Sequence, residues 1–173
     1  MELNCGSFCV KYILEKLGKK NIIIKPNMFW ITELALFLSK NLSNDINLFY
    51  YNSNLMRDYY IQKENEFEGF KYIQEVISSN KINLEEKKLN ISILKHEINI
   101  SKYMIICVES NILNIDENMT GGHYVILEQN KDNELIMYNP KKEVMTSAIV
   151  DYKKVLELCK NYGSWRIIIK EEK

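Results

Sequence analysis

Apolar side chains in the first half of the chain recur at the spacing of amphipathic helices. Val10, Ile13 and Leu14 fall three and four positions apart and would line one face of a helix over 5–17. Gly18 then supplies a stop signal. The same kind of spacing predicts further helices over 30–41, 67–77, 91–98 and 152–159.

Short β-rich runs, most of them in the second half, are separated by polar, turn-like segments. They span 46–51, 103–108, 123–128, 135–138 and 165–169. Helices first and mostly sequential strands afterwards predict an α+β fold with a mostly antiparallel sheet, rather than a doubly wound parallel one. No repeat or linker divides the chain, so residues 1–173 are expected to form a single domain.

Composition and charge narrow the classes of partner. The 173 residues are 46% hydrophobic and 27% charged, which is ordinary for a globular protein with its own core. Lys and Arg together number 23, as do Asp and Glu, so the formal net charge is zero. Because nucleic acids and anionic membranes both favour basic surfaces, we expect neither as a partner.

The cysteines and apolar runs indicate a cytoplasmic protein. No apolar run approaches the roughly 20 residues that a membrane span needs, and no secretion signal opens the chain. Cys5, Cys9, Cys107 and Cys159 show neither metal-type spacing nor the density of a disulfide framework. We therefore expect reduced thiols and no metal or cofactor.

Cys5 stands at the start of the first predicted helix and is the candidate nucleophile. A thiolate there would benefit from the positive end of the helix dipole and from unpaired backbone N–H groups. Gly6 would leave room for a substrate carbonyl, and the N–H of Cys5 could donate to an oxyanion. The alternative is that Cys5 is simply a small apolar residue at a helix start.

His123 and Asn139 could complete an acyl-transfer site. Gly122 and His123 open one predicted strand, Asn139 closes the next, and the turn-like segment 129–133 lies between them. Two antiparallel strands joined there would place the imidazole beside the carboxamide, which could orient it as a general base. The alternative for Asn139, which precedes Pro140, is a turn former.

These motifs resemble those of the papain-like C39 peptidase family. The segment 4–10 fits the family's Asp/Asn-Cys-Gly-x-x-Cys motif followed by an apolar helix, and 122–127 resembles its glycine-histidine strand. Tyr138-Asn139-Pro140 sits where the family usually carries Asp-Pro. The resemblance implies a papain-like fold in which Cys5 is the nucleophile, His123 the base and Asn139 the orienting residue.

A divergent branch, the guanylyl cyclase domain-containing family of plants and animals, is similar over most of the chain. The segments 30–35, 108–113 and 138–140 carry this likeness in collinear order. Two features depart from the pattern. Asn139 replaces an aspartate, and the family's oxyanion glutamine has no counterpart upstream of Cys5, where Asn4 could take its place or could cap the helix.

The expected reaction is acyl transfer through a thioester on Cys5. Passing the acyl group to an amine would make an amide, as in the stand-alone C39-like proteins of natural-product biosynthesis; passing it to water would make the protein a peptidase or amidase. The expected partners are an acyl donor, either a carrier-bound thioester or a peptide, and an amine acceptor.

Two further alternatives are less favoured. Nucleotide cyclisation usually needs carboxylates that hold metal and a phosphate-binding loop; Asp116-Glu117 is the only tempting acidic pair, and no phosphate loop is present. A catalytically silent binding module would explain the missing glutamine, but not the retained cysteine and histidine. The polar segment 110–120 is expected to overhang the cleft.

Overall fold

The structure is a computed structural model, and it describes residues 3–43, 46–50, 67–109, 122–131, 134–141, 144–160 and 165–170. Its helices are α1 (Cys5–Lys16), α2 (Ile31–Asn41), α4 (Phe67–Ser78), α5 (Ile91–Asn99) and α6 (Tyr152–Leu158). All five predicted helices are confirmed, to within two residues at each end. The segment 110–120, with its acidic pair and its expected place over the cleft, lies outside the described residues.

Seven strands form one sheet. They are β1 (Ile46–Tyr50), β2 (Ile82–Glu86), β3 (Ser101–Glu109), β4 (Gly122–Lys131), β5 (Glu134–Lys141), β6 (Val144–Val150) and β7 (Arg166–Lys170). Their order in the sheet is β2-β1-β7-β3-β4-β5-β6. Every neighbouring pair is antiparallel except β1 and β2. The expected α+β fold with a mostly antiparallel sheet is therefore confirmed.

The sequence reading missed the two strands that form the edges of this sheet. Most side chains of β2 and β6 are exposed or only half-buried. β2 buries only Ile82, with Leu84 half-buried, and β6 shows no clean alternation, so neither run is long or apolar enough to indicate a strand. The five strands between them, which are more deeply buried, are the ones that the pattern predicted.

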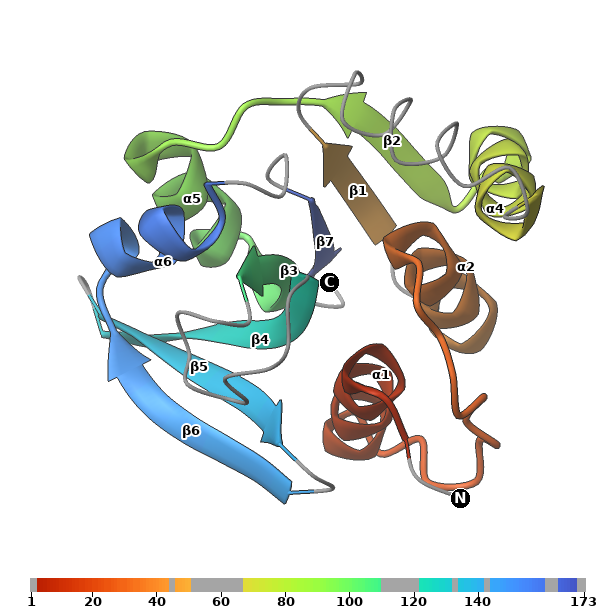
Figure 1. The fold of residues 1–173 in the computed structure, drawn as a ribbon, viewed down its shortest axis with the longest axis horizontal. Helices are drawn as coiled ribbons and strands as arrows, with labels where there is room; N and C mark the ends of the chain where they lie inside the picture. The colour runs from red at the N-terminus through yellow and green to blue at the C-terminus, as the bar shows by residue number, and fades with distance from the viewer. Residues whose placement is uncertain are drawn as a thin grey trace.

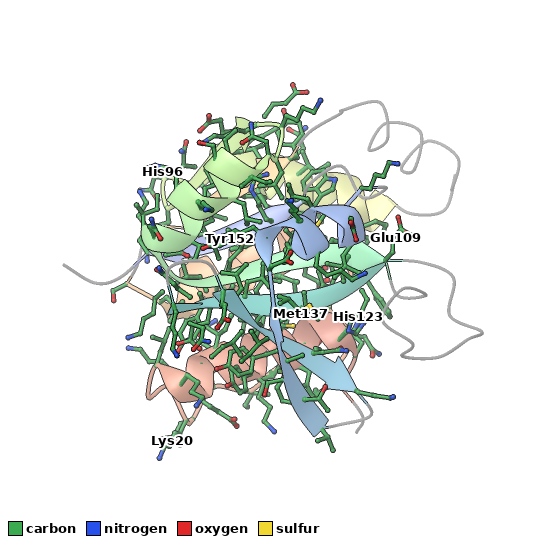
Figure 2. All side chains as sticks on the ribbon, turned by 90° about the vertical axis from the view of Figure 1, so that its left-hand side faces the viewer. Lys20, His96, Glu109, His123, Met137 and Tyr152 are labelled. Carbon is green, nitrogen blue, oxygen red and sulfur yellow. The ribbon has the colours of Figure 1, made fainter. Side chains whose placement is uncertain are left out.

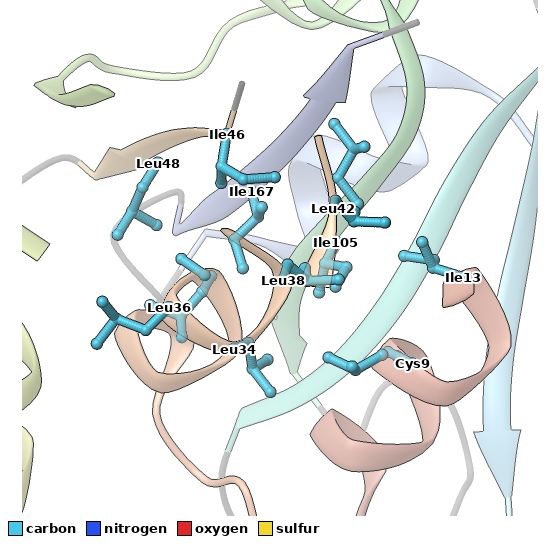
Figure 3. Close-up of a cluster of buried hydrophobic side chains, with 14 of the residues drawn as sticks. Cys9, Ile13, Leu34, Leu36, Leu38, Leu42, Ile46, Leu48, Ile105 and Ile167 are labelled. Carbon is cyan, nitrogen blue, oxygen red and sulfur yellow. The ribbon is translucent and has the colours of Figure 1, made fainter. Parts of the chain in front are cut away.

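Helices cover both faces of the sheet (Figure 1). On one face α1, α2 and α4 enclose a cluster of buried side chains, part of which Figure 3 shows; on the other face α5 and α6 enclose a second cluster. Along β3, Tyr103 and Ile105 belong to the first cluster, whereas Met104 and Ile106 belong to the second. This double burial explains why 103–108 reads as a continuous apolar run.

Among the described helices, none has the length and apolar character to cross a membrane.

A buried ion pair fastens β7, an inner strand of the sheet, to α5. Arg166 and Glu97 are 0% and 1% exposed, and two nitrogens of the guanidinium, Nε and Nη2, donate to the carboxylate oxygens at 2.5 and 2.7 Å. Lys87 contributes its carbonyl, which accepts from Arg166 Nη1 at 3.2 Å, and its ammonium, 3.4 Å from Glu97. The Phe49 ring packs against the guanidinium, 4.8 Å away. Each buried charge is thus matched and hydrogen-bonded.

Removing one partner of this pair should be more damaging than removing both. We expect Glu97→Ala to lower the free energy of unfolding by about 3–5 kcal/mol, because it leaves a buried guanidinium without its counter-charge. The double variant Glu97→Leu with Arg166→Met should lose much less. Urea denaturation of the three proteins measures this, and equal destabilisation of the single and double variants would contradict it.

Candidate active site

Asn4 holds the start of α1 in place. Its side-chain Oδ1 accepts from the N–H of Ser7 at 2.9 Å, and its Nδ2 donates to the carbonyl of Met28 at 3.0 Å. The first bond is an N-cap, which satisfies one of the unpaired N–H groups of the first turn. Of the two roles that the sequence allowed, the structure therefore shows the cap. The carboxamide donates to the protein's own backbone.

The segment 25–29 lies against this first turn and is hydrogen-bonded to it. Ser7 Oγ donates to the carbonyl of Lys25 at 2.6 Å and accepts from the N–H of Met28 at 3.0 Å. The backbone N–H of Asn4 donates to the carbonyl of Pro26 at 3.0 Å. The residues on both sides of Cys5 thus bind the segment 25–29, which we call the return loop. The position of the thiol therefore depends on that loop.

Gly6 permits this close approach. A Cβ at this position would lie 2.5 Å from the carbonyl oxygen of Met28, 3.2 Å from the Leu34 side chain and 3.3 Å from the Tyr124 ring. We expected the absent side chain to leave room for a substrate carbonyl. The structure instead fills that space with the protein's own atoms, so glycine is needed here for packing.

The thiol of Cys5 is partly exposed at the first turn of α1. The backbone amides of Tyr124, Gly6 and Cys5 itself reach the sulfur and favour its thiolate form. Burial acts more strongly in the opposite direction and raises the pKa of the Cys5 thiol above its usual value. The resting residue is therefore a protonated thiol, surrounded by donors that would stabilise it once it is deprotonated.

The other three thiols are less reactive by the same physical reasoning. Cys9, Cys107 and Cys159 are buried, and burial raises the pKa of Cys159 to about 12 and strongly raises the pKa values of Cys9 and Cys107. Because the thiolate is the nucleophilic form, Cys5 should react first of the four.

Tyr124, the third residue of β4, contacts both cysteines of α1. Its N–H reaches the Cys5 sulfur, and its carbonyl accepts from the Cys9 thiol at 3.5 Å. Its ring packs over Gly6, and its hydroxyl donates to the carbonyl of Phe29 at 3.0 Å. One residue of β4 therefore fixes both the helix and the return loop relative to the sheet.

His123 and Asn139 meet as the sequence predicted. His123 Nε2 lies 2.8 Å from Asn139 Oδ1, across the antiparallel pair β4–β5. An amide oxygen can only accept, so Nε2 carries the hydrogen and Nδ1 keeps a free lone pair for use as a base. The hydroxyl of Thr146 on β6 donates to the backbone carbonyl of Asn139 at 3.0 Å, so Asn139 is also held from the side of β6. Asn139 is thus part of a regular strand and not a turn.

The imidazole is neutral at rest. His123 is 5% exposed, and burial lowers its pKa below the usual value, although the bond to Asn139 acts in the opposite direction. Figure 2 shows His123 at the same right-hand end of the sheet as Glu109 of β3. With a neutral thiol and a neutral imidazole, a thiolate at Cys5 would form only if the thiol proton moves to a base.

The thiol and the imidazole approach β4 from different sides. Tyr124 and Ile126 pack toward α1, whereas Val125 and Leu127 pack into the cluster under α5 and α6, and His123 begins this second series. Between these two described side chains there is accordingly no hydrogen bond, although the sulfur reaches the amide of the very next residue. Catalytic hydrogen bonds often close only when substrate is bound.

Gly122, the remaining predicted site residue, is the exposed first residue of β4, opposite Glu109 of β3. It lies at the end of the sheet beside His123. Because it has no side chain, it leaves the access to His123 open from that end. Within the described ranges, no three side chains of the metal-binding types come together in a way that could hold an ion.

Ser7, Tyr124 and the segment 25–29 are positioning elements that the sequence reading did not identify. Ser7 did carry a signal, because it is a polar residue on the face of α1 that buries Val10 and Leu14. A buried hydroxyl must find partners, and here both are backbone groups of the return loop.

Comparisons of the chain with family models, curated proteins and solved structures returned no match.

Gly6→Ala should destabilise the protein and displace Cys5. The added methyl would lie 2.5 Å from a backbone oxygen that Asn4 also holds, so we expect a loss of about 1–3 kcal/mol in the free energy of unfolding. Lys11→Ala, a change at a half-exposed position of the same helix, should cost less than about 0.5 kcal/mol. Urea unfolding measures both, and equal losses would show that the packing at Gly6 is not tight.

His123 should make stability depend on pH. Because its pKa is lowered in the folded state, the unfolded chain binds more protons below about pH 6.5, and stability present above that pH is lost on acidification. The stability advantage of the wild type over His123→Gln should therefore shrink between pH 7 and pH 5. His96→Gln, which changes the other, exposed histidine, should keep the wild-type profile. Urea midpoints at each pH test this, and parallel profiles for wild type and His123→Gln would refute it.

Proposed function

We propose that the protein is a papain-like thiol acyltransferase that forms an acyl-thioester on Cys5 and passes the acyl group to an amine. The observation that carries this proposal is the 2.8 Å contact between His123 Nε2 and Asn139 Oδ1, which leaves Nδ1 as a base. The residue next to His123 touches the thiol of Cys5 through its amide. The proposal assigns the nucleophile to α1, the base to β4 and the orienting group to β5.

The first half of the reaction uses these groups in turn. As the Cys5 sulfur attacks the carbonyl carbon of the donor, Nδ1 of His123 takes the thiol proton. The N–H of Cys5, which has no acceptor within the helix, donates to the developing oxyanion. The imidazolium then gives its proton to the leaving thiol or amine as the carbonyl–leaving-group bond breaks. The acyl group remains on Cys5.

The second half reverses these proton movements. An amine attacks the thioester carbon while His123 takes a proton from its nitrogen. Collapse of the tetrahedral intermediate breaks the carbon–sulfur bond, and the imidazolium returns the proton to the Cys5 sulfur. The products are an amide and the free thiol. Asn139 holds the ring through Nε2 during both halves and carries no charge, so it orients the imidazolium more than it stabilises it.

Burial of the catalytic groups favours an amine over water as the acceptor. His123 is 5% exposed, and burial dominates the pKa shifts of both His123 and Cys5. A site that excludes water protects a thioester from hydrolysis until a bound amine arrives. The alternative is a peptidase or amidase of the same architecture, in which water is the acceptor.

A thioester donor and a diamine distinguish these outcomes. We expect incubation with an acyl-N-acetylcysteamine to leave an acyl adduct on Cys5, visible by mass spectrometry of the intact protein and its peptides. Adding the diamine should discharge the adduct as amide. Cys5→Ser should abolish both steps, and Cys159→Ser, which changes a buried thiol remote in sequence, should retain them. Release of free acid alone would identify a hydrolase, and the absence of any Cys5 adduct would refute a nucleophilic role.

A further inference from the structure

Phe29 combines a fixed backbone with an exposed aromatic ring. Its side chain is 64% exposed. Its N–H donates to Glu33 Oε2 at 3.2 Å, and its carbonyl accepts from the Tyr124 hydroxyl at 3.0 Å. Both hydrogen-bonding groups of its backbone are therefore satisfied within the fold, while an apolar ring faces water.

Glu33, which accepts from the N–H of Phe29, is itself held by further contacts. Glu33 is 6% exposed at the first turn of α2, and its Oε1 accepts from the Tyr72 hydroxyl at 3.1 Å and from the ammonium of Lys25. The carboxylate thus joins the return loop to α2 and α4. Phe29 is held by a network that spans three elements, so its backbone is already ordered before any ligand arrives.

Phe29 is connected to the candidate nucleophile through two of its own neighbours. The carbonyl of Met28, covalently joined to the nitrogen of Phe29, is the group that a Cβ on Gly6 would meet at 2.5 Å. The partner of the Phe29 carbonyl is Tyr124, the residue whose amide reaches the Cys5 sulfur. Phe29 is therefore covalently joined to Met28, which packs against Gly6 next to Cys5. It is also hydrogen-bonded to Tyr124, which follows His123 in the chain.

No other exposed large hydrophobic side chain among the described residues is aromatic; the rest are isoleucines and one valine. An exposed ring gains when an apolar group covers it, and a second ring can add offset or edge-to-face stacking. Because the backbone is fixed, little ordering opposes that gain.

We propose that Phe29 binds the acyl part of the donor and that this part carries an aromatic ring. The inference rests on the proposed acyl transfer through Cys5 and names its substrate class. Phe29 would stack on the ring of the donor while the donor carbonyl lies at the sulfur. Tyr124 and Glu33 act through Phe29 as positioning residues.

Two alkylating reagents test this without knowledge of the substrate. Iodoacetamide and 2-iodo-N-phenylacetamide place the same reactive carbon beside a small amide or a phenyl ring, and their rates toward Cys5 are normalised to their rates toward glutathione. We expect the normalised ratio to favour the phenyl reagent. Phe29→Ala should lower that ratio by about three- to tenfold, and Phe29→Tyr should preserve it. Ile149→Ala removes a side chain of matching exposure, 65%, from β6 and should leave the ratio unchanged.

The outcomes separate this inference from the function on which it rests. If Cys5 reacts faster than the buried thiols but Phe29→Ala leaves the ratio unchanged, the aromatic site is refuted and the nucleophile stands. If Cys5 reacts no faster than Cys107 or Cys159, both proposals fail. A lowered ratio in Phe29→Ala with an unchanged iodoacetamide rate, at a wild-type urea midpoint, supports the aromatic site and shows that the variant is folded.

Discussion

The structure of the candidate site depends on the close packing of the first turn of α1 against β4 and the return loop. Gly6 makes it possible, because any side chain there would collide with the carbonyl of Met28. Asn4 and Ser7 then bind the loop, and Tyr124 closes the arrangement from the sheet side. These contacts place a thiol at the unpaired N–H groups of a helix start, which is where a thiolate can be stabilised.

Burial sets the electrostatic state of this site. It raises the pKa of Cys5 and lowers that of His123, so both groups are neutral at rest. The backbone amides around the sulfur and the carboxamide of Asn139 are already placed where they would stabilise a thiolate and an imidazolium in the proposed reaction. Such a site avoids a resting ion pair and stabilises charge as it develops, which is what preorganised dipoles do best. The buried pair of Arg166 and Glu97, by contrast, is charged and fully matched, as befits a structural contact.

Much of the fold could be predicted because its signals are local. The five helices carry their own apolar periodicity, and the buried strands carry continuous apolar runs. β2 and β6 could not be predicted in this way, since each of these edge strands packs only one or two apolar side chains against the core, too few to form a recognisable pattern. The meeting of His123 with Asn139 was predictable because a hairpin pairs residues near in sequence. The return loop was not, because its partners on α1 and β4 are separated from it by up to about a hundred residues.

The sequence by itself determined the residue types on which any chemistry here must rest, together with the α+β class and the order of the helices. Only the tertiary structure decided their roles: Asn4 is a helix cap, Gly6 is required for packing, and Nε2 of His123 is the nitrogen bound by Asn139. Only the tertiary structure showed that the thiol and imidazole are both neutral. The physical reason is that helix periodicity depends on neighbours in the chain, whereas burial, close approach and hydrogen-bond partners depend on residues that only folding brings together.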